Sequence, residues 1–149
     1  FVSNNYWKYD VEDNVFAIMK TSNNIFATIH SSATQWKHLF SLEINLDKAL
    51  VILSGLKTSS KSYGNETLKI IKKNNIGYKN KEIFKSFNKD DSMDKEIKNF
   101  ISSIINNKKI NFGNCYEAYE TMKLVFDIYY GDKKWRKKYN IPKPIKFNG

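Results

Sequence analysis

The stretch Val15–His30, VFAIMKTSNNIFATIH, decides the fold class of this chain. Its side chains alternate with a period of two: Val15, Ala17 and Met19 fall on one face, and the residues between them fall on the other. A period of two is the spacing of a β-strand. Ser22–Asn24 interrupts the alternation, and asparagine tolerates the positive φ that a tight hairpin requires. The stretch therefore predicts two antiparallel strands joined by a short turn.

The same alternation predicts further strands downstream. His38–Asn45 alternates after a polar connection, Ala49–Leu53 is its expected partner, and weaker patterns indicate strands at Glu66–Lys73 and Lys81–Phe87. Short connections favour antiparallel neighbours, because a parallel pair needs a crossover of about a dozen residues. We therefore expect an open, predominantly antiparallel β-sheet.

Helical patterns follow the strands. After the capping residues Asp90–Ser92 the period changes to 3.6, and apolar side chains form one stripe over Met93–Ile105. A second helix is expected over about Tyr116–Tyr130, with Asn114 and Glu117 at the positions of a capping box. Strands followed by helices predict an α+β fold, here with the two C-terminal helices packed on one face of the sheet.

Length and composition are those of one ordinary domain. The chain has 149 residues, of which 41% are hydrophobic and 15% aromatic, enough for a core without a disulfide or a metal. Its formal charge is +10, and residues 131–149 hold seven basic side chains against one acidic. We expect a sheet domain over residues 1–135 and a basic tail over residues 136–149 that contains Pro142 and Pro144. A basic run is usually a solvated surface.

Redox and targeting features favour a cytoplasmic location. Cys115 is the only cysteine, so an internal disulfide is impossible and a reducing compartment fits best. Apolar stretches such as Ala49–Leu53 are too short to span a bilayer, and residues 1–8 lack the order of a signal peptide. Because Phe1 is not an initiator methionine, we expect the chain to be part of a longer polypeptide.

Recognisable catalytic motifs are missing from the sequence. The six glycines never approach the spacing of a dinucleotide fingerprint or a phosphate loop. Two histidines and one cysteine form no metal set with a recognisable spacing, and no serine stands in a Gly-x-Ser-x-Gly elbow. The sequence predicts no catalytic, cofactor-binding or metal site within this chain.

An ordered series of segments resembles one enzyme family. Glu12–Asn14 precedes a strand, an asparagine-rich turn and a strand that ends at His30–Ser32; TQWKHLFSLEI at Thr34–Ile44 follows, and then SYGNETL at Ser62–Leu68. With the two helices, these segments are similar in order and spacing to the C-terminal domain of the Gfo/Idh/MocA oxidoreductases. The resemblance covers about Val11–Trp135.

The resemblance implies an NAD(P)-dependent parent enzyme that acts on a sugar, a sugar derivative or a polyol. In that family a Rossmann domain, a Glu-Lys-Pro turn and a Gly-Gly-x-x-x-Asp-x-x-x-His helix precede the segment matched here. This chain contains none of them, and neither His30 nor His38 follows a Gly-Gly pair. NAD or NADP would therefore belong to the parent enzyme, and this chain alone would bind neither and carry no catalytic residue.

The resemblance also implies that this domain supplies one wall of the substrate site. Trp36, Lys37 and His38 enter a predicted strand, where polar donors beside an aromatic plane suit sugar hydroxyls. Tyr63 is a fourth candidate. The alternatives are that Trp36 packs, that Lys37 is solvated and that Tyr63 covers the edge of the sheet. Glu66 has no partner visible in the sequence and is expected to be exposed.

The sheet face is the expected site of association. Several predicted strands carry apolar side chains on both faces, and two helices cover only one of them, which leaves an apolar patch typical of an interface. We expect homo-oligomers through this face, beside the Rossmann domain of the same polypeptide and a sugar-like substrate.

Two other functions remain open. The first is a basic β-sheet module that binds nucleic acid, favoured by the charge of +10 and by Trp135 and Tyr139 among the lysines of residues 133–138. The strand sequences argue against it, because they predict no consistent aromatic and basic face. The second is a purely structural dimerisation domain.

Overall fold

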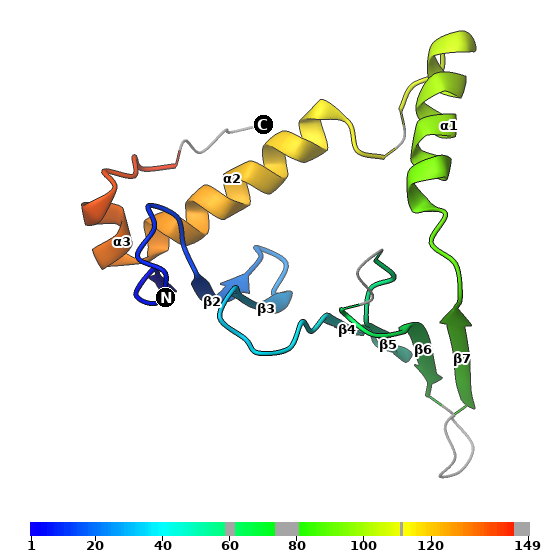
Figure 1. Ribbon diagram of the computed structural model, residues 1–149, viewed down its shortest axis with the longest axis horizontal. Coiled ribbons are helices and arrows are strands. Elements are labelled where there is room, and N and C mark those ends of the chain that lie inside the picture. Colours follow the sequence, from blue (N-terminus) through cyan, green and yellow to red (C-terminus); the bar gives the residue numbers. More distant parts are fainter. Residues whose placement is uncertain (59–61, 74–80, 111, 145–149) are drawn as a thin grey trace. The chain divides into compact units, whose positions relative to one another are not determined.

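The computed structural model describes residues 1–58, 62–73, 81–110 and 112–144. The chain divides into two compact units: a terminal unit, Phe1–Gln35 with Lys109–Gly149, and a central unit, Trp36–Lys108. In the described ranges the terminal unit contains β1 (Val2–Ser3), β2 (Asn14–Lys20), β3 (Phe26–Ser32), α2 (Cys115–Gly131) and α3 (Lys133–Lys138). The central unit contains β4 (Ser41–Asn45), β5 (Ala49–Ser54), β6 (Glu66–Lys72), β7 (Lys81–Phe87) and α1 (Ser92–Ile105) (Figure 1).

The terminal unit is built on a three-stranded antiparallel sheet in the order β1-β2-β3. The predicted hairpin is confirmed: Thr21 N donates to the carbonyl of Ile25 at 2.9 Å, and Asn24 adopts a φ of 62°. Asparagine is one of the few residues that enter this left-handed region at low cost, so the turn follows from local sequence.

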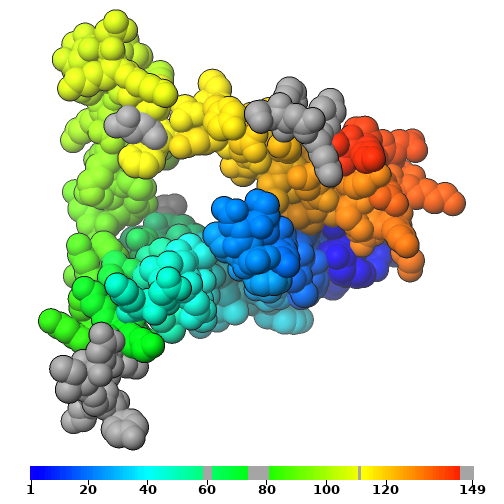
Figure 2. Space-filling view, turned by 180° about the vertical axis from the view of Figure 1, so that it is seen from behind, coloured from blue at the N-terminus to red at the C-terminus, as the bar shows by residue number. Residues whose placement is uncertain are grey.

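One face of this sheet packs against the C-terminal helices. Val2 and Val15 are buried together with Trp135 of α3, and partly buried side chains surround this small core: Ile128, Tyr129, Tyr139 and Ile141. Figure 2 shows the orange and red residues of α2 and α3 against the dark blue N-terminal residues. Residues at opposite ends of the sequence therefore form one core.

The central unit is an antiparallel meander in the order β4-β5-β6-β7. Directly paired residues of antiparallel strands share a face, and one face carries two largely apolar rows: Leu42, Leu53 and Leu68, which ends at Lys85, and Ile44, Val51, Ile70 and Ile83. The opposite face is mixed and includes the Lys69–Glu82 ion pair at 2.9 Å. The first face is therefore apolar over β4, β5 and the middle of β6, and lysines flank it at Lys72, Lys81 and Lys85.

The helix caps are partly as predicted. In α2 the Asn114 side chain accepts from Glu117 N at 3.0 Å, and the Glu117 carboxylate accepts from Asn114 N, so the capping box is confirmed. In α1 the N-cap is Asp91, whose side chain makes no capping bond and instead pairs with Lys95 at 2.8 Å. The side chain of Asp90, one residue before the N-cap, accepts from Ser92 N at 3.0 Å. The capping hydrogen bond therefore comes from Asp90 and not from the N-cap residue Asp91.

The α+β class, the antiparallel pairing and the C-terminal helices are confirmed, with three departures in detail. The described strands form two sheets, of three and four strands, where the sequence predicted one. The sequence did not predict β1 or α3. Helix α2 packs on a sheet through the partly buried Ile128 and Tyr129, and neither α1 nor α2 has a fully buried residue. No helix in the described parts of the chain is both long and apolar enough to cross a bilayer.

Candidate substrate-binding site

The structure brings two of the four predicted substrate residues together. The rings of His38 and Tyr63 lie 5.0 Å apart between centroids and are inclined by 31°. His38 is exposed and Tyr63 half-buried. Trp36 and Lys37, which precede His38 in the chain, have exposed side chains. Trp36 is therefore not packed within the central unit.

Gly55 explains how His38 and Tyr63 meet. Its N–H donates to the carbonyl of Phe40 at 2.9 Å, which holds the end of β5 beside the segment that carries His38. Its φ is 71°, and an added Cβ would clash with the Asn65 carbonyl and lie 3.1 Å from the carbonyl oxygen of Tyr63. Only glycine allows the Tyr63–Asn65 turn to approach this closely.

Glu66 also lies near this pair, although the sequence predicted only an exposed side chain. Its carboxylate accepts from the backbone N–H of Lys57 at 3.0 Å, and the side chain is half-buried rather than exposed. This bond ties the segment that follows Gly55 to the start of β6. Gly55 and Glu66 thus position the Tyr63–Asn65 turn and Lys57.

The His38–Tyr63 pair offers two hydrogen-bonding groups beside aromatic faces. A neutral imidazole has one donor and one acceptor nitrogen, and a phenol both donates and accepts. Such a pair can bind neighbouring hydroxyls of a sugar while a ring face packs on its C–H groups. In the described parts of the chain no three His, Cys, Asp or Glu side chains gather as a metal site.

His30 has a different environment. It lies on β3 of the terminal unit and stacks on Phe16, with ring centroids 4.2 Å apart and an angle of 17°. This cross-strand pair follows directly from the register Phe16–His30. The imidazole therefore serves as a packing group on the sheet.

A buried carboxylate, which was not predicted from the sequence, organises the loop before β2. Asp13 is 4% exposed and accepts hydrogen bonds from Ser3 Oγ, Tyr6 N, Trp7 N and Asn14 Nδ2 at 2.8 to 3.2 Å. Burial alone would raise the pKa of Asp13, but these four donors favour the ionised form and hold the pKa below its ordinary value.

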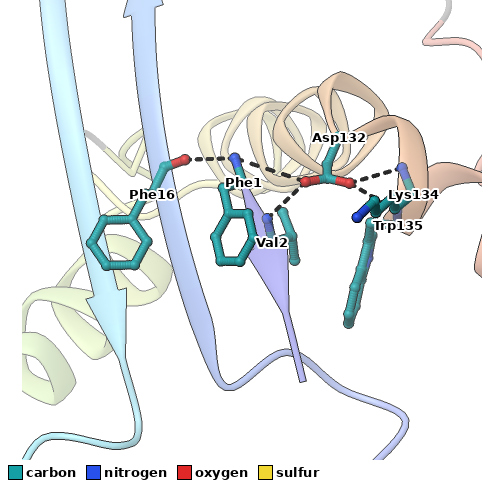
Figure 3. A network of polar contacts seen from close by, with 6 residues as sticks. All are labelled: Phe1, Val2, Phe16, Asp132, Lys134 and Trp135. Carbon is teal, nitrogen blue, oxygen red and sulfur yellow. Dashed lines mark hydrogen bonds and ion pairs between the residues drawn. The ribbon is translucent and has the colours of Figure 1, made fainter. Parts of the chain in front are cut away.

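A second carboxylate joins the two ends of the terminal unit (Figure 3). Asp132 caps α3 by accepting from Lys134 N and Trp135 N, both at 2.9 Å, and also accepts from Val2 N at 3.1 Å. The amino group of Phe1 lies 3.9 Å from the same carboxylate. Burial opposes ionisation, but the backbone donors of Trp135, Val2 and Lys134 lower the pKa of Asp132.

Asn4 closes the same end of the unit. Its Nδ2 donates to the hydroxyl of Tyr139 at 2.9 Å and to the carbonyl of Tyr9, and its Oδ1 accepts from Lys138 Nζ at 3.0 Å. The ammonium group of Lys138 also lies 5.0 Å from the centre of the Tyr139 ring. Part of the basic C-terminal segment is therefore engaged in folding.

Comparison with protein-family models, with curated proteins and with solved structures gave no match, so the function of this chain has to be argued from its own residues and geometry.

Proposed function

We propose that this chain is the substrate-binding and oligomerisation domain of an NAD(P)-dependent oxidoreductase that acts on a sugar, a sugar derivative or a polyol. The Rossmann domain of the same parent polypeptide would bind NAD or NADP and supply the catalytic residues, so the chain alone is catalytically incomplete. Cys115 is a free, exposed thiol, and a reducing cytoplasm is the compartment that suits it.

The observation that carries the proposal is the convergence of His38 and Tyr63. They come from two segments that the family resemblance singled out independently, TQWKH and SYGNETL. Gly55 and Glu66 hold these segments together. A pair of polar aromatic side chains on a supported turn suits the wall of a site for a hydroxyl-rich substrate.

The decisive experiment uses the parent polypeptide. NAD(P)H formation is measured over a panel of sugars and polyols, and His38→Ala and Tyr63→Phe are then compared with wild type. Each variant should raise KM by about tenfold, since each removes hydrogen bonds to the bound substrate. His30→Ala is the matched control, because this histidine packs on Phe16, and its KM should stay unchanged. If none of the sugars and polyols supports NAD(P)H formation, the oxidoreductase assignment is overturned.

The isolated chain provides a second test. It should show no thermal shift with millimolar NADH or NADPH beyond the shift that an equally charged anion produces, because stabilisation requires binding to the native state. A clear and specific shift would mean that this chain itself holds the cofactor.

The apolar face of the β4–β7 sheet supports the homo-oligomer. Its rows of leucine, isoleucine and valine include half-exposed side chains such as Leu42, Ile44 and Ile83. Stable interfaces bury about 800 Å2 per partner, and apolar patches of this kind usually mark such contacts.

A charge placed on either face of β4 tests the oligomer. Ile44→Lys introduces an ammonium group into the apolar row and should convert the oligomer to monomer in light scattering at micromolar concentration. Glu43→Lys places the same group on the opposite face of the same strand and should leave the mass unchanged. A wild-type protein that is monomeric throughout would refute this interface.

The nucleic-acid alternative gains support from the open face of the β1–β3 sheet. Phe16 and His30 stack there, and Lys20 lies 5.2 Å from the ring centre of Phe26 on the same face. Aromatic planes beside a lysine suit single-stranded nucleic acid. Titration with single-stranded RNA at two salt concentrations separates the functions: binding that weakens steeply with salt favours this alternative, and no binding at low salt excludes it.

A further inference from the structure

An open surface pocket of about 330 Å3 lies in the terminal unit, within the N-terminal 35 residues, and its lining residues Trp7, Tyr9 and Val11 are exposed. Its walls are two aromatic side chains, two small or branched apolar ones and two carboxylic acids: Trp7, Tyr9, Val11, Glu12, Asp13 and Ala33. It belongs to a different unit from His38 and Tyr63. It therefore needs an explanation of its own.

The Trp7 side chain and the backbone of Tyr9 are held in place by contacts within the chain. Trp7 N donates to the Asp13 carboxylate at 3.2 Å, and Trp7 Nε1 donates to the Ala33 carbonyl at 3.3 Å. The ring of Tyr6 meets Trp7 edge-on at 4.9 Å, and Asn4 holds the carbonyl of Tyr9. A preorganised wall lowers the ordering cost of binding.

The two acids play different parts. Asp13 is buried and already accepts four hydrogen bonds, so its carboxylate is committed to the loop. Glu12 is half-buried, and its carboxylate is close enough to the Tyr129 hydroxyl of α2 to raise the pKa of that phenol. A carboxylate has about four lone-pair sites, so Glu12 keeps acceptor capacity and its negative charge for a ligand.

Charge and lining select the ligand class. The six lining residues include no base, although the chain as a whole carries +10. Aromatic faces attract cations through their quadrupole, best when an anion is near. A neutral sugar would need several polar partners that point into the pocket, whereas these walls are mostly apolar.

We propose that the pocket beside Trp7, Tyr9 and Glu12 binds an organic cation with apolar substituents, of the alkylammonium class. The methyl groups of such a cation would pack on the Trp7 and Tyr9 rings, and its charge would face Glu12. This site does not rest on the oxidoreductase assignment, because none of its residues belongs to the substrate wall proposed above.

Choline is the probe, and its neutral isostere 3,3-dimethyl-1-butanol is the control of equal shape. Isothermal titration of the 149-residue chain should give saturable choline binding with a dissociation constant on the order of 1 mM. The isostere should bind at least about tenfold more weakly. In a 15N-labelled sample the Trp7 indole resonance should shift with the same midpoint.

Variants locate the site. Trp7→Leu and Glu12→Gln should each weaken choline binding by about tenfold, the first by removing the ring face and the second by removing the charge. Trp36→Leu, at a fully exposed tryptophan of the central unit, should leave binding unchanged. Far-ultraviolet circular dichroism verifies that each variant is folded, and Tyr9→Leu replaces any variant that is not.

Three results would overturn the proposal. The first is no saturable choline binding at about 50 mM, where a site of millimolar affinity would be filled. The second is equal binding of the neutral isostere or stronger binding of glucose, which would exclude a cation site. The third is unchanged choline affinity in both Trp7→Leu and Glu12→Gln. A failed choline titration leaves the turnover test of the parent enzyme unaffected, so the two proposals fail separately.

Discussion

The two units of this chain are stabilised by different kinds of contact. The terminal unit joins residues 120 or more positions apart: Val2 and Val15 pack with Trp135, and Asn4 and Asp132 form hydrogen bonds between the two ends of the sequence. The central unit is one continuous segment in which each strand pairs with the next. One unit depends on a few buried side chains, and the other on backbone pairing between sequence neighbours.

This difference has a consequence for function. Short-range pairing leaves the side chains of the central unit free to form a surface: an apolar face on the sheet and the His38–Tyr63 pair at its connection. In the terminal unit, side chains that look equally reactive in the sequence, such as Asp13 and Lys138, hold the fold together. Substitutions of the groups that hold the terminal unit should therefore change stability, whereas substitutions of His38 and Tyr63 should change binding.

The largest expected effect is the loss of the buried tryptophan. Trp135→Ala should destabilise the terminal unit by about 4 kcal/mol, because a side chain that is 6% exposed leaves a cavity behind. Trp36→Ala removes the same side chain from a fully exposed position and should change stability by less than about 0.5 kcal/mol. Urea unfolding followed by circular dichroism gives both values, and similar values for the two would contradict the assignment of the core.

Gly55→Ala tests the central unit. It combines a positive φ with a collision against the Asn65 carbonyl and should cost about 3 kcal/mol. Gly64→Ala also has a positive φ, 79°, but meets nothing within 4 Å, so it should cost only about 1 kcal/mol. Thermal unfolding compares the stability of the two variants. An equal loss of stability would mean that the close approach of Gly55 to the Asn65 carbonyl does not contribute to the cost.

Asp132→Ala tests the bond between the chain ends. Losing the α3 cap and the Val2 contact should cost about 1 to 2 kcal/mol at neutral pH. Because the folded-state pKa of Asp132 is lowered, its stabilising effect is complete above the unfolded pKa of about 3.9 and is lost as the pH falls through the folded pKa.

Urea titrations of wild type and Asp132→Ala from neutral to acidic pH measure this dependence. The gap between them should close below about pH 4. A gap that stays constant across that range would show that the carboxylate charge is irrelevant.

The smallest effect concerns Tyr129 at alkaline pH. Burial, followed by the hydrogen bond to Glu12 and the charge of Glu12, raises the pKa of Tyr129 to about 12. The neutral phenol is favoured in the fold, so its stabilisation is present below the unfolded pKa of about 10 and disappears as the pH rises towards 12.

Tyr129→Phe removes this dependence. Between about pH 10 and 12, wild type should lose more stability than the variant, and ultraviolet absorption at the phenolate band should assign a late titration to Tyr129. Tyr6→Phe, at an exposed tyrosine of the same unit, is the control. Identical alkaline profiles for wild type and Tyr129→Phe would contradict the Glu12 contact.

Local sequence was enough for most elements. The hairpin around Asn24, the meander strands from Ala49 onward and the capping box at Asn114 and Glu117 were predicted, because each depends on residues within a few positions of one another. Helix α3 was missed because its six residues, KKWRKK, show no amphipathic repeat; it begins at a cap whose carboxylate also bonds to Val2.

The sequence by itself determined most of the strands and helices and their antiparallel pairing, since periodicity and turn chemistry are local properties, and the family resemblance singled out His38 and Tyr63, which meet at the candidate site. Only the tertiary structure decided that Asp13 and Asp132 are hydrogen-bonded into the fold, that Gly55 allows a close approach and that Trp7, Tyr9 and Glu12 line one pocket. The physical reason is that burial and hydrogen-bond partners depend on contacts between distant residues, which no pattern of neighbouring side chains specifies.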